Sequence, residues 1–141
     1  MVSFRPHVIF SAAITLDGKL ATRTGDSKLS SKKDRIRVHK LRSKVDAILI
    51  GKNTAKLDDP LLSAHDAKKN PIRIILDSNA TIRTNSKILE TCSKIPTIIA
   101  VSKKAQKKNL QKLEKFPVQV IVCGNYTVNI KKLLGILKKK A

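Results

Sequence analysis

Cysteine is scarce in this sequence. Its 141 residues include two cysteines, Cys92 and Cys123, and neither has a second cysteine at the spacing of a metal site or a redox motif. The three histidines, His7, His39 and His65, show no regular spacing either. These absences argue against a structural zinc site and against metal binding by histidine. We expect reduced thiols and a cytoplasmic protein.

Three further features are missing. Aromatic residues make up only 3% of the chain, so the core must be built from Ile, Leu, Val and Ala. No apolar run approaches the length that spans a bilayer, and the first ten residues lack the pattern of a secretory signal, so we expect no membrane association. The motifs G-x-G-x-x-G and G-x-x-x-x-G-K-[ST] are absent, which disfavours a standard dinucleotide fold and a nucleotide hydrolase.

Positive charge, in contrast, is abundant. Thirty Lys and Arg residues face ten Asp and Glu residues, which gives a formal net charge of +20. Such a charge attracts polyanions, but it does not distinguish a nucleic acid from a phosphorylated metabolite or a dinucleotide. The length and the 41% of hydrophobic residues predict a single globular domain over residues 1–141.

Apolar runs alternate with amphipathic stretches along the chain. The Val- and Ile-rich runs predict strands at residues 7–14, 45–51, 72–78, 96–102 and 118–124. Helices are predicted at residues 30–44, 103–116 and 128–141, the first of them capped by Ser30 or Ser31. Residues 51–71 are predicted to be mostly loop with one short helical turn. This alternation predicts an α/β fold with a mostly parallel central sheet flanked by helices.

The loop after the first predicted strand is richly polar. It reads "TLDGKLATRTGDSKLSS" and combines glycines and hydroxyl side chains with Lys19. Such a loop can turn backbone N–H groups towards a phosphate or carboxylate, with Lys19 as a point charge. The alternative is a plain turn in which Lys19 points into water.

A second polar loop follows the predicted strand at residues 45–51. In "GKNTAKLDDPLL", Thr54 offers a donor and an acceptor, and two carboxylates precede a proline. Asp59 is interpreted as a capping or turn residue, whereas Asp58 is kept as a site candidate.

A third polar loop follows the predicted strand at residues 72–78. Asp77 is placed either to bind a ribose hydroxyl or to form an ordinary turn, and Ser78 to meet a cofactor phosphate. Because the carboxyl ends of parallel strands share one edge of a sheet, we expect all three polar loops to meet there.

Taken together, these segments resemble a known family. In order and spacing, "SAAITLDGKLATRTGDSKLSS", "RVHKLRSKVDAILIGKNTAKLDDPLLSAH" and "NPIRIILDS" are similar to the pyrimidine reductase of riboflavin biosynthesis. The family includes stand-alone archaeal and fungal enzymes and the reductase half of a bacterial bifunctional enzyme. The resemblance implies a dihydrofolate-reductase-like fold, a homodimer and direct hydride transfer from NADPH, without metal or flavin. The substrate would be a phosphorylated diaminopyrimidinone whose ribosylamino group is reduced to ribitylamino.

The resemblance also implies roles for individual residues. Those that would contact NADPH are Ala13, Leu29, Thr54, Asp58 and Ser78. Those that would face the substrate are Lys19, Ser27, Arg42, Leu62 and His65, where the family often has arginine in place of the histidine. Lys19 is the candidate catalytic residue, which would polarise the substrate or deliver a proton.

Family members continue past the position of Ala141. The resemblance implies that a further buried strand, a glycine-rich loop around the cofactor pyrophosphate and the last strands of the sheet are missing from these 141 residues. The expected domain is therefore an incomplete reductase-like one.

Two other functions stay open at this point. The +20 charge is compatible with a basic nucleic-acid-binding module, which we rank second because RNA-binding sheets stack bases on aromatic side chains and this chain has few. The other alternative is a catalytically silent remnant of the reductase that acts as an oligomerisation partner.

Overall fold

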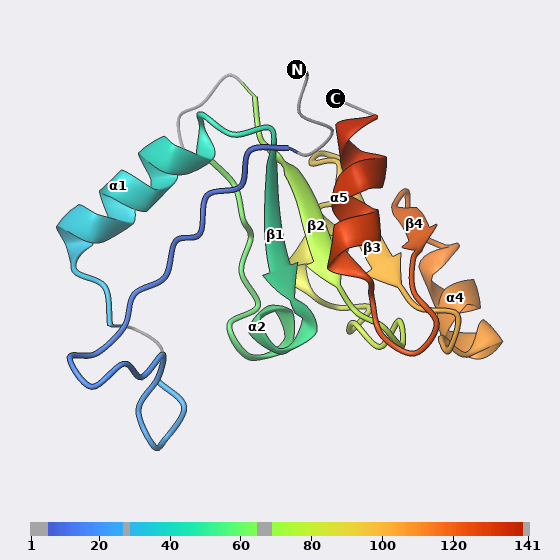
Figure 1. The fold of residues 1–141 in the computed structure, drawn as a ribbon, viewed down its shortest axis with the longest axis horizontal. Helices are drawn as coiled ribbons and strands as arrows, with labels where there is room; N and C mark the ends of the chain where they lie inside the picture. The colour runs from blue at the N-terminus through green and yellow to red at the C-terminus, as the bar shows by residue number, and fades with distance from the viewer. Residues whose placement is uncertain (1–5, 27–28, 65–68, 140–141) are drawn as a thin grey trace.

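Four parallel strands form the centre of the molecule (Figure 1). The computed structural model describes residues 6–26, 29–64 and 69–139. Within them the strands lie in the order β1-β2-β3-β4, and their bounds are β1 Ala47–Gly51, β2 Ile72–Leu76, β3 Thr97–Val101 and β4 Gln119–Val122. The predicted mostly parallel sheet is confirmed, and four of the five predicted strands are present.

Helices cover both faces of this sheet. Their bounds are α1 Lys32–Arg42, α2 Lys52–Leu57, α3 Lys87–Glu90, α4 Lys107–Leu113 and α5 Ile130–Lys138. Side-chain caps fix where three of them begin: Ser31 accepts from the Asp34 N–H, Ser86 from Leu89 and Asn129 from Lys132. The helix predicted over residues 103–116 is shorter, and residues 52–57 are more helical than expected.

Two hydrophobic cores result from the alternation of side chains along the strands. Ile75, Ile99 and Val101 point to the face covered by α2, α3 and α4. Ile98 and Ala100 point to the opposite face, where Leu133 of α5 is fully buried. Burying one such Leu or Ile side chain stabilises the fold by about 1.5–3 kcal/mol. This is why strands with near-continuous apolar sequence suit this sheet.

The strand predicted at residues 7–14 is wrong. None of these residues is in a strand, and Phe10 is 89% exposed. The segment runs between α1 and β1 (Figure 1), and no described strand pairs with it. An apolar run becomes a strand only where a neighbour satisfies its backbone N–H and C=O groups, and no described strand does so here.

Arg73 crosses the first core, which is the one on the face covered by α2, α3 and α4. Its side chain is fully buried and donates to the carbonyl oxygens of Leu61 (3.2 Å), Ile88 (2.8 Å) and Ile95 (3.2 Å). It also donates to the hydroxyls of Thr91 (2.8 Å) and Thr97 (2.8 and 3.1 Å). Burial lowers the pKa of the Arg73 guanidinium.

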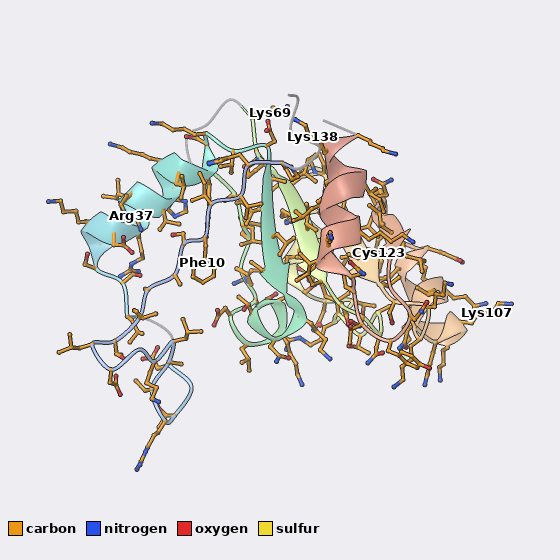
Figure 2. All side chains as sticks on the ribbon, viewed as in Figure 1. Phe10, Arg37, Lys69, Lys107, Cys123 and Lys138 are labelled. Atoms are coloured by element: carbon orange, nitrogen blue, oxygen red, sulfur yellow. The ribbon has the colours of Figure 1, made fainter. Side chains whose placement is uncertain are left out.

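Both cysteines are free and buried. Figure 2 shows Cys123 beside the first turn of α5, and the Cys123 carbonyl accepts from Asn129 N–H at 2.9 Å. Burial raises the pKa of the Cys123 thiol. Among the described helices, none is long and apolar enough to cross a membrane.

Candidate functional site

An open groove of about 470 Å³ lies at the carboxyl ends of the strands. Its walls come from the start of α2, the exit of β2, the exit of β3 and the loop before α5. Its lining includes the side chains of two hydroxyl residues, two lysines and a tyrosine: Thr54, Ser78, Lys52, Lys104 and Tyr126. In Figure 1 this is the lower edge of the sheet, where the strand arrows end.

The exit of β2 is built by Asp77. This residue is fully buried, and its carboxylate accepts from the N–H groups of Thr81 (2.5 Å) and Ile82 (2.7 Å). Of the two roles that the sequence left open, the structure gives Asp77 the turn. Its carboxylate stabilises the loop behind the groove.

Ser78 joins three carboxyl ends. Its hydroxyl accepts from the Val128 N–H at 3.1 Å, in the loop before α5. Its carbonyl accepts from both the N–H (3.0 Å) and the hydroxyl (2.8 Å) of Ser102, which follows β3. Because the Ser78 hydroxyl uses an oxygen lone pair for Val128, its own hydrogen is left to donate towards a ligand.

Thr54 and Asp58 lie on α2 and at its end. Thr54 is exposed and lines the groove, while its carbonyl accepts from the Asp58 N–H at 3.0 Å. Asp58 follows the last residue of α2 and is also exposed. The neighbouring Asp59 accepts from the Lys87 N–H at 3.0 Å, so the prediction of a capping role for it is confirmed.

The first polar loop lies elsewhere. Thr15 N–H donates to the Lys19 carbonyl at 2.8 Å, and Gly18 has the positive φ of +77° that this turn requires. The Lys19 side chain is exposed. Figure 1 shows the loop below α1, well separated from the groove. The predicted meeting of three loops is therefore right for the two that follow β1 and β2, and wrong for this one, because residues 7–14 do not join the sheet.

The remaining candidates are dispersed. Ala13 and Leu29 are half-buried outside the groove lining. Arg42 is half-buried at the end of α1, donates to the Ser63 carbonyl at 3.4 Å and has its pKa lowered by burial. Leu62 is 4% exposed within the first core, with φ of +56°. Ser27 and His65 lie outside the described residues.

Three residues of the groove were missed at the level of sequence. Lys52 directly follows β1, Lys104 comes three residues after β3, and Tyr126 lies in the loop before α5. Their position just beyond strand ends was the available signal, but lysine is so frequent here that neither Lys52 nor Lys104 stood out.

Comparison with known proteins decides the family. The model of the family described as RibD C-terminal domain matches residues 6–141. The chain belongs to the RibD C-terminal domain family. The resemblance seen in the sequence is thereby confirmed.

Relatives in this family carry reductase names. The chain is 42% identical over 134 residues to the 2,5-diamino-6-ribosylamino-4(3H)-pyrimidinone 5′-phosphate reductase of Methanothermobacter thermautotrophicus, covering 92% of the chain and 61% of that protein. It is 38% identical over 142 residues to the Aquifex aeolicus protein of the same name, covering 96% of the chain and 63% of that protein. The chain thus spans about three fifths of the length of these relatives.

A solved member of the family has the same architecture. The Thermotoga maritima diaminohydroxyphosphoribosylaminopyrimidine deaminase/5-amino-6-(5-phosphoribosylamino)uracil reductase superposes with a TM-score of 0.74 at 28% identity, covering 96% of this chain and 36% of that one. The predicted dihydrofolate-reductase-like α/β fold is confirmed.

Proposed function

We propose that the chain acts in riboflavin biosynthesis as an NADPH-dependent oxidoreductase. It reduces the ribosylamino side chain of 2,5-diamino-6-ribosylamino-4(3H)-pyrimidinone 5′-phosphate to the ribitylamino form. The observation that carries this proposal is the 42% identity, over 92% of the chain, to a reductase named for that substrate. The groove at the carboxyl edge of the sheet supports it, because ligands of parallel α/β sheets bind at that edge.

The groove suits an anionic nucleotide. Hydroxyl groups of Thr54 and Ser78 line it together with two lysines, and phosphate oxygens accept hydrogen bonds from such donors. NADPH, when bound, supplies a hydride. The residues that we assign to NADPH are Ala13, Leu29, Thr54, Asp58 and Ser78.

The substrate is a phosphate monoester, and we assign Arg42 to bind its phosphate group. Its contact with the Ser63 carbonyl fixes the guanidinium, which stays protonated at neutral pH although burial lowers its pKa. Leu62 contributes its backbone, since its side chain is buried in the core. The residues that we assign to the substrate are Lys19, Ser27, Arg42, Leu62 and His65.

Lys19 is the proposed catalytic residue. Its ammonium group donates a proton or a hydrogen bond to the substrate as the ribosylamino group is reduced. The Thr15–Lys19 turn fixes its backbone, and the exposed side chain is free to reach a ligand that binds over the loop.

The proposal includes a homodimer in the cytoplasm that does not act on nucleic acid. The exposed apolar side chains of residues 8–16, among them Phe10, support self-association, because large exposed apolar patches mark interaction sites. The two free thiols support a reducing compartment.

The test is turnover of the pyrimidinone phosphate with NADPH, followed by loss of the NADPH absorbance. We expect substrate-dependent oxidation by the wild-type chain and a decrease of about 100-fold in Lys19→Met, the effect of removing a general acid. Lys33→Met, an exposed lysine on α1, is the matched control and keeps wild-type turnover. Absence of turnover in the wild-type chain would refute the function, and full turnover in Lys19→Met would refute the role of Lys19.

A further inference from the structure

The loop between β4 and α5, residues 123–129, is held in one shape. It lies at the lower edge of the sheet, below α5 (Figure 1), and lines the groove with Tyr126 and Thr127. The Asn129 N–H donates to the Cys123 carbonyl at 2.9 Å and so closes the loop on itself. A wall that is ordered in this way reduces the cost of ordering when a ligand binds against it.

Gly124 makes this shape possible. Its φ is +108°, and a Cβ atom on it would lie 2.0 Å from the Thr127 carbonyl oxygen and 2.9 Å from the Asn129 nitrogen. Any side chain would therefore collide with the backbone across the loop. The Gly124 carbonyl also accepts from the Lys103 N–H at 2.9 Å, which fastens the loop to the exit of β3.

One contact joins this loop to a side chain of the groove. The Val128 N–H donates to the Ser78 hydroxyl oxygen at 3.1 Å, whereas the two hydrogen bonds described above join backbone atoms only. The Val128 side chain packs against the core that contains Leu133 of α5, so the fold sets the position of its N–H. A hydroxyl that accepts on one side directs its own hydrogen to another side. The Val128 N–H thus leaves the Ser78 hydroxyl as a donor at the groove.

This orientation matters for binding. The hydrogen of a serine hydroxyl rotates to suit its surroundings, and a ligand that accepts it must otherwise fix that rotation itself. Here the Val128 N–H fixes the rotation during folding. The chain of N–H, hydroxyl and ligand also strengthens itself, because each hydrogen bond polarises the next. The Ser78 backbone is equally fixed, since the Ser102 hydroxyl donates to the Ser78 carbonyl at 2.8 Å.

We propose that Val128 is a positioning residue. Its N–H holds the Ser78 hydroxyl as a hydrogen-bond donor to the cofactor, so the loop between β4 and α5 contributes to cofactor affinity through Ser78. This inference rests on the proposed function, since it concerns the cofactor that we assign to Ser78.

The experiment removes the Val128 N–H and keeps the side chain. A synthetic peptide of residues 123–141 begins with Cys123, so native chemical ligation can join it to a thioester of residues 1–122 and rebuild the whole chain. The variant Val128→α-hydroxyvaline carries an ester oxygen that cannot donate. The matched control is Leu133→α-hydroxyleucine, which removes an N–H that donates to the Asn129 carbonyl at 2.9 Å within the first turn of α5.

Calorimetric titration with NADPH measures each ligated chain, with and without the substitution Ser78→Ala. We expect Val128→α-hydroxyvaline to weaken NADPH binding by about 3- to 10-fold, the effect of one neutral hydrogen bond, and the control to bind like wild type. In the Ser78→Ala background the same ester has no further effect, because the hydroxyl that the N–H orients is absent. A purely structural role of the N–H would weaken binding equally in both backgrounds.

A second measurement needs no ligation. Exchange of the Val128 amide hydrogen, followed by NMR, should slow when NADPH binds to wild type, because binding strengthens the bond to the Ser78 hydroxyl. In Ser78→Ala this slowing is absent. Circular dichroism checks that each variant folds, and the exchange measurement decides if the ester variant does not.

Three outcomes overturn the inference: unchanged affinity of Val128→α-hydroxyvaline, equal weakening with and without the Ser78 hydroxyl, or Val128 exchange that NADPH does not slow. If wild type binds NADPH, each of them refutes only the inference. Absence of NADPH binding by wild type refutes the proposed function and the inference with it.

Discussion

The Arg73 guanidinium lies fully inside the first core, and every acceptor found for it is a neutral oxygen. Three backbone carbonyls and two threonine hydroxyls share its five N–H donors. A buried charge normally carries a large desolvation cost unless it is paired, and here the many hydrogen bonds offset it. The side chain ties β2 to the segments around residues 61, 88 and 95, so its role is structural.

Arg73→Lys is expected to destabilise the fold although it keeps the charge. An ammonium group has three donors and no planar fork, so at least two of the oxygens would lose their partner in a buried place. We expect the free energy of unfolding to fall by about 3 kcal/mol, as urea titration would measure. Arg35→Lys, at an exposed position on α1, is the control and should lie within about 0.5 kcal/mol of wild type. A change for Arg73→Lys as small as for that control would mean that the network contributes little.

At the scale of elements, α1 differs from the other helices. It buries none of its eleven residues, whereas α5 fully buries Leu133 and the whole of β3 is buried. The Ser31 cap and the Arg37–Asp34 ion pair at 2.8 Å stabilise its first two turns, and the ion pair lowers the pKa of Asp34. Local stability follows tertiary packing more than capping. The helix is therefore the element most loosely coupled to the fold.

Hydrogen exchange should separate α1 from the sheet. We expect the amides of residues 35–42 to exchange much faster than those of residues 97–101, because opening α1 exposes no buried side chain. Ser31→Ala removes the cap and should accelerate exchange in α1 by about fivefold, the effect of about 1 kcal/mol, while β3 stays unchanged. Equal protection of α1 and β3 would contradict the loose coupling.

The difference between packed and unpacked segments also explains what could be predicted from the sequence. The runs at residues 72–76 and 97–101 were identifiable as strands because each pairs with a strand that comes next in the sequence, so the local pattern agreed with the tertiary structure. Residues 7–14 have the same apolar pattern but no described partner strand, and the pattern alone does not say whether a partner strand is present.

In the site, Thr54 and Ser78 were found because hydroxyls after apolar strands are distinctive. Lys52 and Lys104 were missed because thirty cationic residues conceal two that converge only in three dimensions.

At the scale of the whole molecule, charge is the dominant feature. The thirty Lys and Arg residues outnumber the ten acidic residues threefold, so most cations have no carboxylate available and repel one another in the compact state. At 0.1 M, added salt screens the repulsion between charges that lie more than about 10 Å apart.

The melting temperature should therefore rise with ionic strength. Between about 0.01 and 0.3 M sodium chloride, where the screening length falls several-fold, we expect an increase of several degrees in thermal unfolding followed by circular dichroism. Potassium chloride at the same ionic strength is the control for specific ion effects and should give the same increase. A midpoint that falls or stays constant would show that attractive pairs outweigh the repulsion.

The order β1-β2-β3-β4 also bears on how the molecule forms. Each described strand pairs with the one that comes next along the chain, so within the described residues no strand has to wait for a distant segment before it finds its neighbour. During synthesis on the ribosome, β1 and β2 can pair while β4 is still to be translated, and the sheet then grows at one edge as the chain emerges.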